Sequence, residues 1–274
     1  MPYGDYRAIR IEIDAGVAFA TLDHPPINLL DLELMGELDR LSRELATDET
    51  VRVLVLSSAN PEFFIAHADV ALIEQLPTER ATKPTGLGFF HAMVERFRTL
   101  PQATIAKIEG RTRGGGSELV LSLDLRFAAK GRAILAQPEV ALGILPGGSG
   151  TQRLPRLMGR GRALEVILGC EDFDAELAER YGYVNRAVPA EEIGDFVEKL
   201  ARRIASFPPH AVRLAKEAVA AAEPSPVPGL LVEDDCFTRS LGVPETRRLM
   251  RAFLEAGGQT RDVELDLERL LARL

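Results

Sequence analysis

The chain has 274 residues, and its 33 Lys or Arg against 41 Asp or Glu give a formal net charge of −8. This acidic balance argues against binding of nucleic acid or of an anionic membrane surface through a broad basic face. Hydrophobic residues make up 46% of the chain, as in an ordinary globular protein, and its length allows one large core or one core with a small appended module. Residues 1–16 lack the apolar core of a signal peptide, and no stretch resembles a membrane span. Because Cys170 and Cys236 suit neither a metal site nor a disulfide framework, we expect a cytoplasmic protein without a bound metal.

The first half of the chain alternates predicted strands with predicted helices. Ala8–Asp14 and Val17–Leu22 have strand chemistry on both sides of Ala15-Gly16, which predicts a hairpin. Phe63–Val70 is predicted to be a loop that enters a helix, with Asp69 as its cap. Further strands are predicted at Val51–Leu56, Ala103–Ile108, Leu125–Ala129 and Ala133–Leu135, and helices at Leu34–Leu45 and Phe89–Thr99.

From Thr151 onward the pattern predicts helices almost exclusively. They are expected at Thr151–Met158, Gly161–Ile167, Ala175–Tyr181, Ala190–Ala205, Pro209–Ala222, Leu231–Leu241, Glu245–Ala256 and Val263–Leu274. Strands alternating with helices, followed by helices alone, predict an α/β core with a helical C-terminal region. We place the core at residues 1–205 and the helical region at residues 206–274.

Several common catalytic motifs are missing. The Gly143–Gly150 stretch does not have the spacing of a dinucleotide fingerprint, and there is no Walker motif or Gly-x-Ser-x-Gly elbow. His24, His67, His91 and His210 have no metal-ligand spacing, so packing or surface roles are favoured for them.

The three consecutive glycines Gly114, Gly115 and Gly116 follow a predicted strand and precede a short helix. The first N–H groups of a helix have no internal partner, so this end could hold an oxyanion or a thioester oxygen. Glu118 falls in the first turn. It could act as an acid or base, or it could simply favour the helix start, and the residues themselves leave both roles open.

Glu139 stands in an otherwise apolar stretch, 21 residues after Glu118 (139 − 118). A carboxyl group in apolar surroundings has a raised pKa and can exchange protons near neutral pH. Two carboxylates in unlike environments could divide the roles of acid and base. The alternative is that Glu139 merely begins a helix behind Pro138.

Three blocks, Phe64–Asp69, Gly110–Leu119 and Gln137–Leu154, together resemble the enoyl-CoA hydratase/isomerase (crotonase) superfamily. The resemblance runs in register from the first hairpin to about Leu254. It implies an α/β, crotonase-like spiral core of ββα units with a helical C-terminal trimerisation region. It also implies a homotrimer or hexamer, and an acyl-CoA thioester substrate in which coenzyme A is the only cofactor-like group.

The resemblance assigns roles position by position. The backbone N–H groups of Ala68 and Gly115 would form the oxyanion hole, and Glu118 and Glu139 would activate water and deliver the α-proton. Having both glutamates favours hydration of a 2-enoyl-CoA. Substrate-binding positions implied by the resemblance are Ala66, near the adenine end of the coenzyme, and His67, Asp69, Gly114, Pro146 and Gly147.

His67 departs from the family pattern, which has glycine there. The added β-carbon could re-aim the oxyanion donor, or the imidazole could occupy part of the ligand site. Two alternatives stay open: an isomerase or other acyl-CoA enolate enzyme that uses one glutamate, and, because of His67, a CoA-thioester-binding protein with little catalysis. The Ala252–Gly257 stretch also lacks the basic residue that commonly follows, which removes one expected contact to a coenzyme phosphate.

Overall fold

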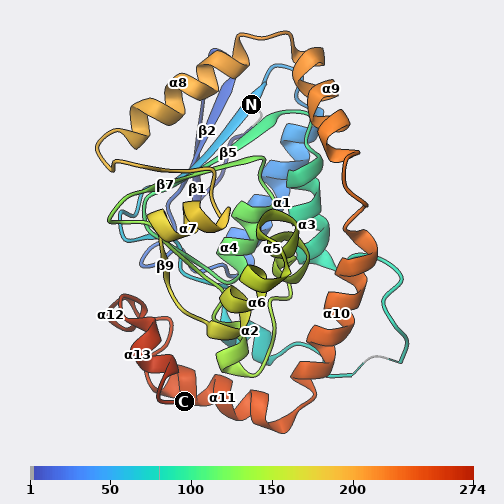
Figure 1. The fold of residues 1–274 in the computed structure, drawn as a ribbon, viewed down its shortest axis with the longest axis vertical. Helices are drawn as coiled ribbons and strands as arrows, with labels where there is room; N and C mark the ends of the chain where they lie inside the picture. Colours follow the sequence, from blue (N-terminus) through green and yellow to red (C-terminus); the bar gives the residue numbers. More distant parts are fainter. Residues whose placement is uncertain (1–2, 80) are drawn as a thin grey trace.

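The computed structural model describes residues 3–79 and 81–274, and its largest sheet has six strands (Figure 1). The strand order is β1-β2-β3-β5-β7-β10. Only β1 and β2 pair antiparallel, which confirms the predicted hairpin, and every other neighbouring pair is parallel. The bounds are β1 (Ile9–Asp14), β2 (Val17–Leu22), β3 (Val53–Ser58), β5 (Ala103–Ile108), β7 (Leu125–Ala129) and β10 (Arg186–Val188).

A second sheet contains four short strands in the order β4-β6-β8-β9. They are β4 (Phe63–Ile65), β6 (Arg111–Arg113), β8 (Ile134–Ala136) and β9 (Phe173–Asp174). Strands β3, β5 and β7 of the large sheet are each followed along the chain by a strand of the small sheet, β4, β6 and β8 in turn. The chain therefore winds as a spiral in which each turn gives one strand to each sheet. The loop predicted at Phe63–Val70 is wrong in its first three residues, which form β4 by pairing with β6.

Helices cover both faces of the large sheet. On one face α1 (Leu32–Thr47) packs beside α3 (Phe89–Thr99), while α4 (Gly115–Leu121) lies within the core. On the other face α8 (Ile193–Ala205) packs on β2, β3, β5 and β7. Asp31 caps α1 by accepting the Leu34 N–H, and the apolar residues spaced along α1 form its buried face.

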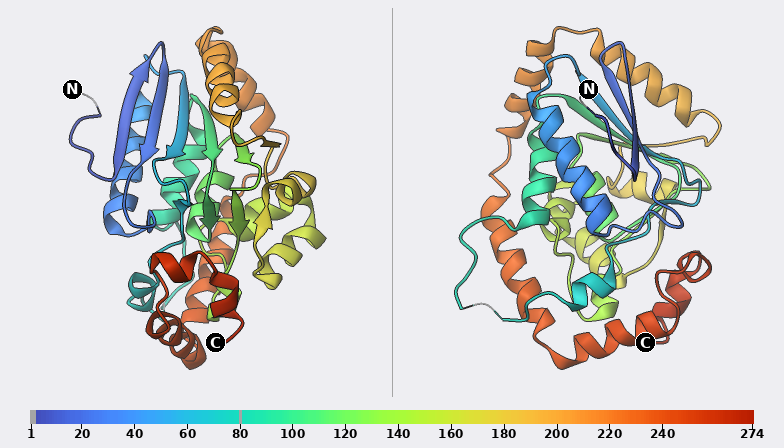
Figure 2. Two further views of the ribbon diagram at one scale, coloured as in Figure 1. Left: turned by 90° about the vertical axis from the view of Figure 1, so that its left-hand side faces the viewer. Right: turned by 180° about the vertical axis from the view of Figure 1, so that it is seen from behind.

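From α8 onward the chain runs round the periphery, and α11 to α13 form one end of the molecule (Figure 2). The predicted helix at Val263–Leu274 is wrong: two short helices form, with Asp266 (φ −134°, ψ 52°) between them. The break lets Leu267 enter a cluster with Met250 and Phe253. The remaining bounds are α2 (Val70–Glu74), η1 (Glu139–Leu142), α5 (Gly150–Met158), α6 (Arg160–Gly169), α7 (Ala175–Tyr181), α9 (Pro209–Ala220), α10 (Val227–Leu241), α11 (Pro244–Glu255), α12 (Arg261–Glu264) and α13 (Leu267–Leu271).

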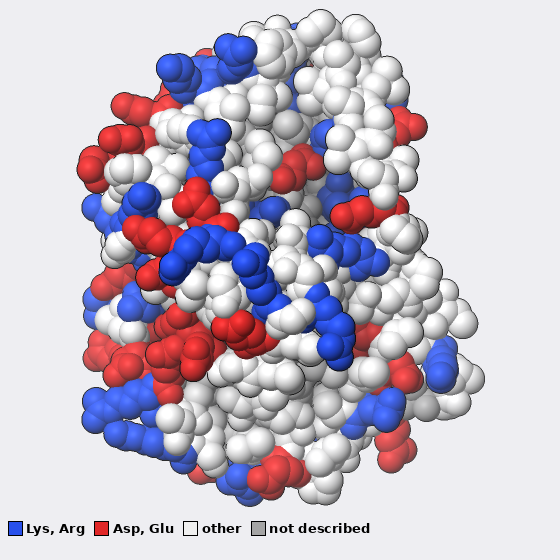
Figure 3. Space-filling model, viewed as in Figure 1, with Lys and Arg blue, Asp and Glu red and all other residues white. Residues whose placement is uncertain are grey.

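The surface mixes both signs of charge. On the face shown in Figure 3, acidic and basic side chains are interspersed, and the region over α9 is mostly uncharged. None of the residues of α9 is buried, and its Leu214 and Val219 are 51% and 74% exposed. Within the described residues, no helix is both long and apolar enough to span a bilayer.

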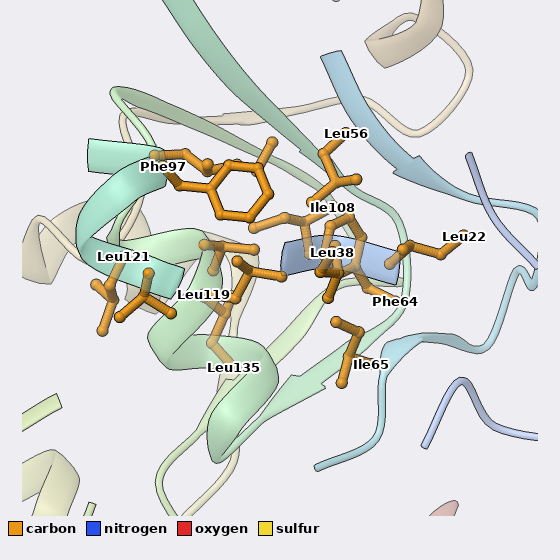
Figure 4. Packing of buried hydrophobic residues seen from close by; sticks show 14 of the residues in the cluster. Leu22, Leu38, Leu56, Phe64, Ile65, Phe97, Ile108, Leu119, Leu121 and Leu135 are labelled. Atoms are coloured by element: carbon orange, nitrogen blue, oxygen red, sulfur yellow. The ribbon is translucent and has the colours of Figure 1, made fainter. Parts of the chain in front are cut away.

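The core lies between the large sheet, α1, α3 and α4 (Figure 4). Side chains alternate across a strand, and in β3 Leu54 and Leu56 face this core while Val53 and Val55 face the cluster under α8. Leu119 and Leu121 of α4 are among the buried residues of the main cluster. Every residue of α4 is buried, and its first two residues, Gly115 and Gly116, belong to the glycine run.

Candidate active site

The predicted site residues meet at one edge of the small sheet. Strands β4, β6 and β8 are parallel, so their carboxyl ends lie at the same edge. The segment after β4 contains Ala68, the residues after β6 are Gly114 and Gly115, and the segment after β8 leads to Glu139. The spiral thus brings together positions that are far apart in the sequence.

Ala68 and Gly115 lie side by side. A β-carbon added to Gly115 would be 3.3 Å from the Ala68 Cβ and 2.9 Å from the Leu30 Cδ2. Leu30 pairs with the flanking residues of Ala68, since its N–H donates to the His67 carbonyl (3.0 Å) and its carbonyl accepts from the Asp69 N–H (3.1 Å). In the described part of the chain, the N–H groups of Ala68 and Gly115 donate to no protein acceptor. Two adjacent free donors are the geometry that an oxyanion needs.

Gly114 joins this donor pair to a carboxyl group. Its φ of +50° and ψ of −125° favour glycine, and an added Cβ would lie 2.7 Å from Glu139 Oε1. The same Cβ would lie 3.4 Å from the His67 Cβ. Glycine is therefore required here both by the backbone conformation and by the close approach of Glu139.

Glu118 projects from α4 and is 3% exposed. Its Oε1 accepts the N–H groups of Gly148 (2.7 Å) and Gly150 (2.8 Å), at the start of α5. Burial raises the pKa of Glu118 to about 7, and the charge of Glu233 contributes to the rise, while the two amides and His91 oppose it. The carboxyl group is therefore held in place and can exchange a proton near neutral pH.

Glu139 begins η1 directly after Pro138. Its Oε2 is buried and has no hydrogen-bond partner among the described residues. Burial raises the pKa of Glu139 well above its usual range, and the charge of Glu118 raises it further. Unlike Glu118, whose Oε1 takes two backbone amides, Glu139 favours the neutral, proton-carrying form.

A cavity of about 30 Å³ lies beside these groups. His67, Ala68, Pro138 and Glu139 line one side of it. Apolar side chains complete the lining, and they come from α2, from η1 and the segment after it, and from α11 and α13: Val70, Ile73, Leu142, Ile144, Phe253, Leu267 and Leu271. The C-terminal helices of this chain therefore form part of its own site.

His67 has an ordinary negative φ, so the backbone freedom of glycine is not required at this position. Its Nδ1 lies 2.7 Å from the Ala68 carbonyl oxygen and its Nε2 lies 2.9 Å from Glu264 Oε1. Burial lowers the pKa of His67, but the charge and hydrogen bond of Glu264 outweigh it and leave the pKa raised. Both ring nitrogens are thus engaged by protein groups, and the imidazole ties the Ala68 segment to α12.

The other predicted binding residues surround this arrangement. Asp69 caps α2 by accepting the Ala71 N–H (2.9 Å), as expected from the sequence. Ala66 is buried beside Ile27 and Phe63. Gly147 packs under Phe237, where a Cβ would come within 2.5 Å of the ring, and Pro146 packs against Gly150.

Two site residues escape prediction from the sequence. His91 of α3 and Glu233 of α10 are 4% and 2% exposed, and His91 Nε2 lies 2.8 Å from Glu233 Oε1. Both stand near Glu118, because both influence its pKa. A signal for Glu233 exists: it is a charged residue on the helix face that carries the buried Leu230 and Leu241.

Comparisons with known proteins identify the family of the chain. The family described as "Enoyl-CoA hydratase/isomerase" matches residues 12–260. A short-chain-enoyl-CoA hydratase of Clostridium acetobutylicum is 32% identical over 247 residues, which cover 89% of this chain and 94% of the relative. A crotonyl-CoA hydratase of Syntrophomonas wolfei is 32% identical over 252 residues, covering 91% and 96%. A crystal structure from Streptomyces avermitilis, provisionally described as an enoyl-CoA hydratase, has 42% identity and a TM-score of 0.91, with 98% of each chain covered.

These matches confirm the predicted superfamily and the predicted crotonase-like α/β fold class. Each turn of the spiral gives one strand to each sheet, and these turns correspond to the repeated units that the resemblance implied. Because the family model and the relatives match most of its length, and its fold matches that of the crystal structure, the chain belongs to the enoyl-CoA hydratase/isomerase family.

Proposed function

We propose that the protein adds water across the double bond of a 2-enoyl-CoA thioester. Relatives named as short-chain-enoyl-CoA and crotonyl-CoA hydratases bear out the hydratase predicted from the sequence. The observation that carries the proposal is the placement of two carboxyl groups with raised pKa values, Glu118 and Glu139, at one site. Two unused backbone donors, those of Ala68 and Gly115, lie at the same sheet edge.

The backbone donors would stabilise the enolate. As water attacks the β-carbon, the electron pair of the double bond moves toward the α-carbon and the thioester oxygen. The N–H groups of Ala68 and Gly115 would receive the negative charge on that oxygen. Losing one such donor costs about 3 kcal/mol of transition-state stabilisation in comparable sites.

The unlike surroundings of the glutamates divide their roles. Two amide donors favour the ionised form of Glu118, which would take a proton from water as the new carbon–oxygen bond forms. Glu139 lacks such donors on Oε2 and would deliver its proton to the α-carbon. One carboxyl group gains a proton and the other loses one, so exchange between them or with solvent restores the starting state.

The test is hydration of crotonyl-CoA and of a longer 2-enoyl-CoA, followed by loss of absorbance of the conjugated thioester. Wild type is expected to be active, and Glu118→Gln and Glu139→Gln are each expected to reduce kcat at least a hundredfold, about the contribution of general acid–base catalysis. Binding of the thioester without turnover by wild type would refute the proposal. Deuterium uptake at the α-carbon without hydration would indicate the isomerase alternative.

The proposed reaction needs only protein carboxyl groups and amides, with coenzyme A as part of the substrate. Among residues 3–79 and 81–274 there is no group of three His, Cys, Asp or Glu placed to hold a metal ion. We therefore expect full activity in the presence of EDTA and without an added cofactor.

We also propose that the protein forms a homotrimer or a dimer of trimers through α9. This helix has no buried residue, and it presents the exposed side chains of Leu214 and Val219 to solvent over a mostly uncharged surface (Figure 3). A second copy that packed around this helix would remove both side chains from water. Sedimentation velocity of wild type and of Val219→Asp tests this, and a monomeric wild type would exclude it.

We also propose that the protein is located in the cytoplasm. Cys170 and Cys236 are both free thiols. Burial raises the pKa of the Cys170 thiol, which keeps it protonated and unreactive. Cell fractionation with an antibody to the protein tests this location.

A further inference from the structure

Two buried carboxylates share the start of α5. The N–H groups of Gly148 and Gly150 donate to Glu118, while those of Ser149 and Thr151 donate to Glu233, with N···O distances of 2.6 Å and 3.0 Å for the Glu233 pair. Four consecutive amides therefore alternate between the two acids. The Thr151 hydroxyl also donates to Glu233. The start of this helix is held from two sides, by α4 and by α10.

His91 supplies the counter-charge for Glu233. Burial lowers the pKa of His91, but the hydrogen bond and charge of Glu233 outweigh burial and leave the pKa raised. Both side chains are almost fully buried, at 4% and 2% exposed. A buried charge is costly unless it is paired and hydrogen-bonded, and here each partner satisfies the other.

The loop between the two acids has an unusual backbone. Ser149 has a φ of +109°, which is rare for any residue other than glycine. Its N–H binds Glu233 and its hydroxyl accepts from Arg153 Nε (2.8 Å). Such a conformation persists only where its surroundings hold it. By holding Ser149, Glu233 keeps the neighbouring amides of Gly148 and Gly150 aimed at Glu118.

Nearby charges influence the pKa of Glu118, in addition to the amides that hold its carboxyl group in place. Burial is the main cause of its raised pKa, the charge of Glu233 raises it as well, and the charge of His91 lowers it. The charged and titratable groups around this cluster come from α3, α5, α10 and η1, and they are His91, Glu95, Arg153, Glu233, Asp234 and Glu139.

We propose that Glu233 and His91 are positioning residues for the hydration reaction: their buried ion pair holds the loop at Gly147–Thr151 and sets the charge around Glu118. The inference rests on the proposed function, in which Glu118 accepts a proton from water. It assigns an active-site role to a helix of the C-terminal region. At Gly229 this helix lies close to α5, since a Cβ there would meet the end of the Gln152 side chain.

The test is the pH profile of kcat/KM with crotonyl-CoA for wild type, Glu233→Gln and His91→Gln. Removing the Glu233 charge is expected to move the acidic limb to lower pH by about one pH unit and to reduce kcat about tenfold. Removing the His91 charge is expected to move the same limb to higher pH. Opposite movements distinguish charge tuning from loss of structure, which would lower the rate without moving the limb in two directions.

Asp235→Asn is the matched control, because it removes a charge from the same helix at a residue whose ion pair with Arg239 (3.9 Å) is at the surface. Its profile is expected to match that of wild type. An active wild type with unmoved limbs in both variants would overturn the inference and leave the hydratase proposal standing. If Glu233→Gln fails to fold, the His91→Gln profile alone decides. An inactive wild type would refute the hydratase proposal instead.

Discussion

The buried carboxyl of Glu118 should cost the protein stability as the pH rises. Its pKa is about 7 in the folded protein against 4.5 for an ordinary glutamate. The folded state therefore holds this proton more tightly, so the free energy of unfolding falls as the pH rises from 4.5 to about 7 and is flat above that. Between pH 5 and pH 8 the loss is about 2–3 kcal/mol from this group. Glu118→Gln should remove that loss.

The measurement is urea unfolding at pH 5 and pH 8, at one protein concentration because subunit association would otherwise change the result. The drop in unfolding free energy between the two pH values should be about 2–3 kcal/mol smaller in Glu118→Gln than in wild type. Removing the Glu118 charge also removes one cause of the raised pKa of Glu139, which reduces the pH dependence of stability further. Glu191→Gln, at an exposed position, should behave as wild type. Equal drops in wild type and Glu118→Gln would refute the reasoning.

Three further outcomes are expected. Gly114→Ala should reduce kcat for crotonyl-CoA hydration at least tenfold, because the added Cβ would lie 2.7 Å from Glu139 Oε1. The control is Gly131→Ala, which is also at a positive φ but in open space, and it should lower stability without loss of activity in the same assay. Glu264→Gln should increase hydrogen exchange in α12 and α13, and unchanged exchange would contradict a role for its pairing with His67. The increase in exchange should be larger at pH 6 than at pH 9. Because Glu264 raises the pKa of His67 above 6.5, the stability that this pair contributes is fully present below pH 6.5 and is lost as the pH rises through the raised pKa of His67.

Much of the fold follows from local sequence patterns. The long strands β1, β2, β3, β5 and β7 and the amphipathic helices carry clear periodicity, which predicts an α/β core, and the family resemblance implies its spiral arrangement. Of the small sheet the sequence predicts only β8, at Ala133–Leu135, because the strands β4, β6 and β9 are two or three residues long and too short to show alternation. They form because pairing in the folded protein satisfies their backbone groups.

Some residues of the candidate site could be predicted from the sequence and others could not. Glu118, Glu139 and Gly115 stand beside glycine turns that mark them in the sequence, whereas Ala68 is identified only by the family resemblance, and the structure brings all four to one sheet edge. The pair of His91 and Glu233 is separated by 142 residues and belongs to no motif. The partner of His67 was equally hidden, because Glu264 lies 197 residues away. Pairings of this kind depend on tertiary packing and have no local pattern.

The alternating amides at the start of α5 fix the length of the loop that leads to it. With Gly148 and Gly150 bound to one acid and Ser149 and Thr151 to the other, gaining or losing one residue before the helix would exchange the two sets. A side chain at the position of Gly148 would then meet Phe90, and one at the position of Gly150 would meet Pro146 and Glu118. Over evolutionary time this loop should therefore tolerate substitution at selected positions while resisting insertion and deletion, unlike most surface loops.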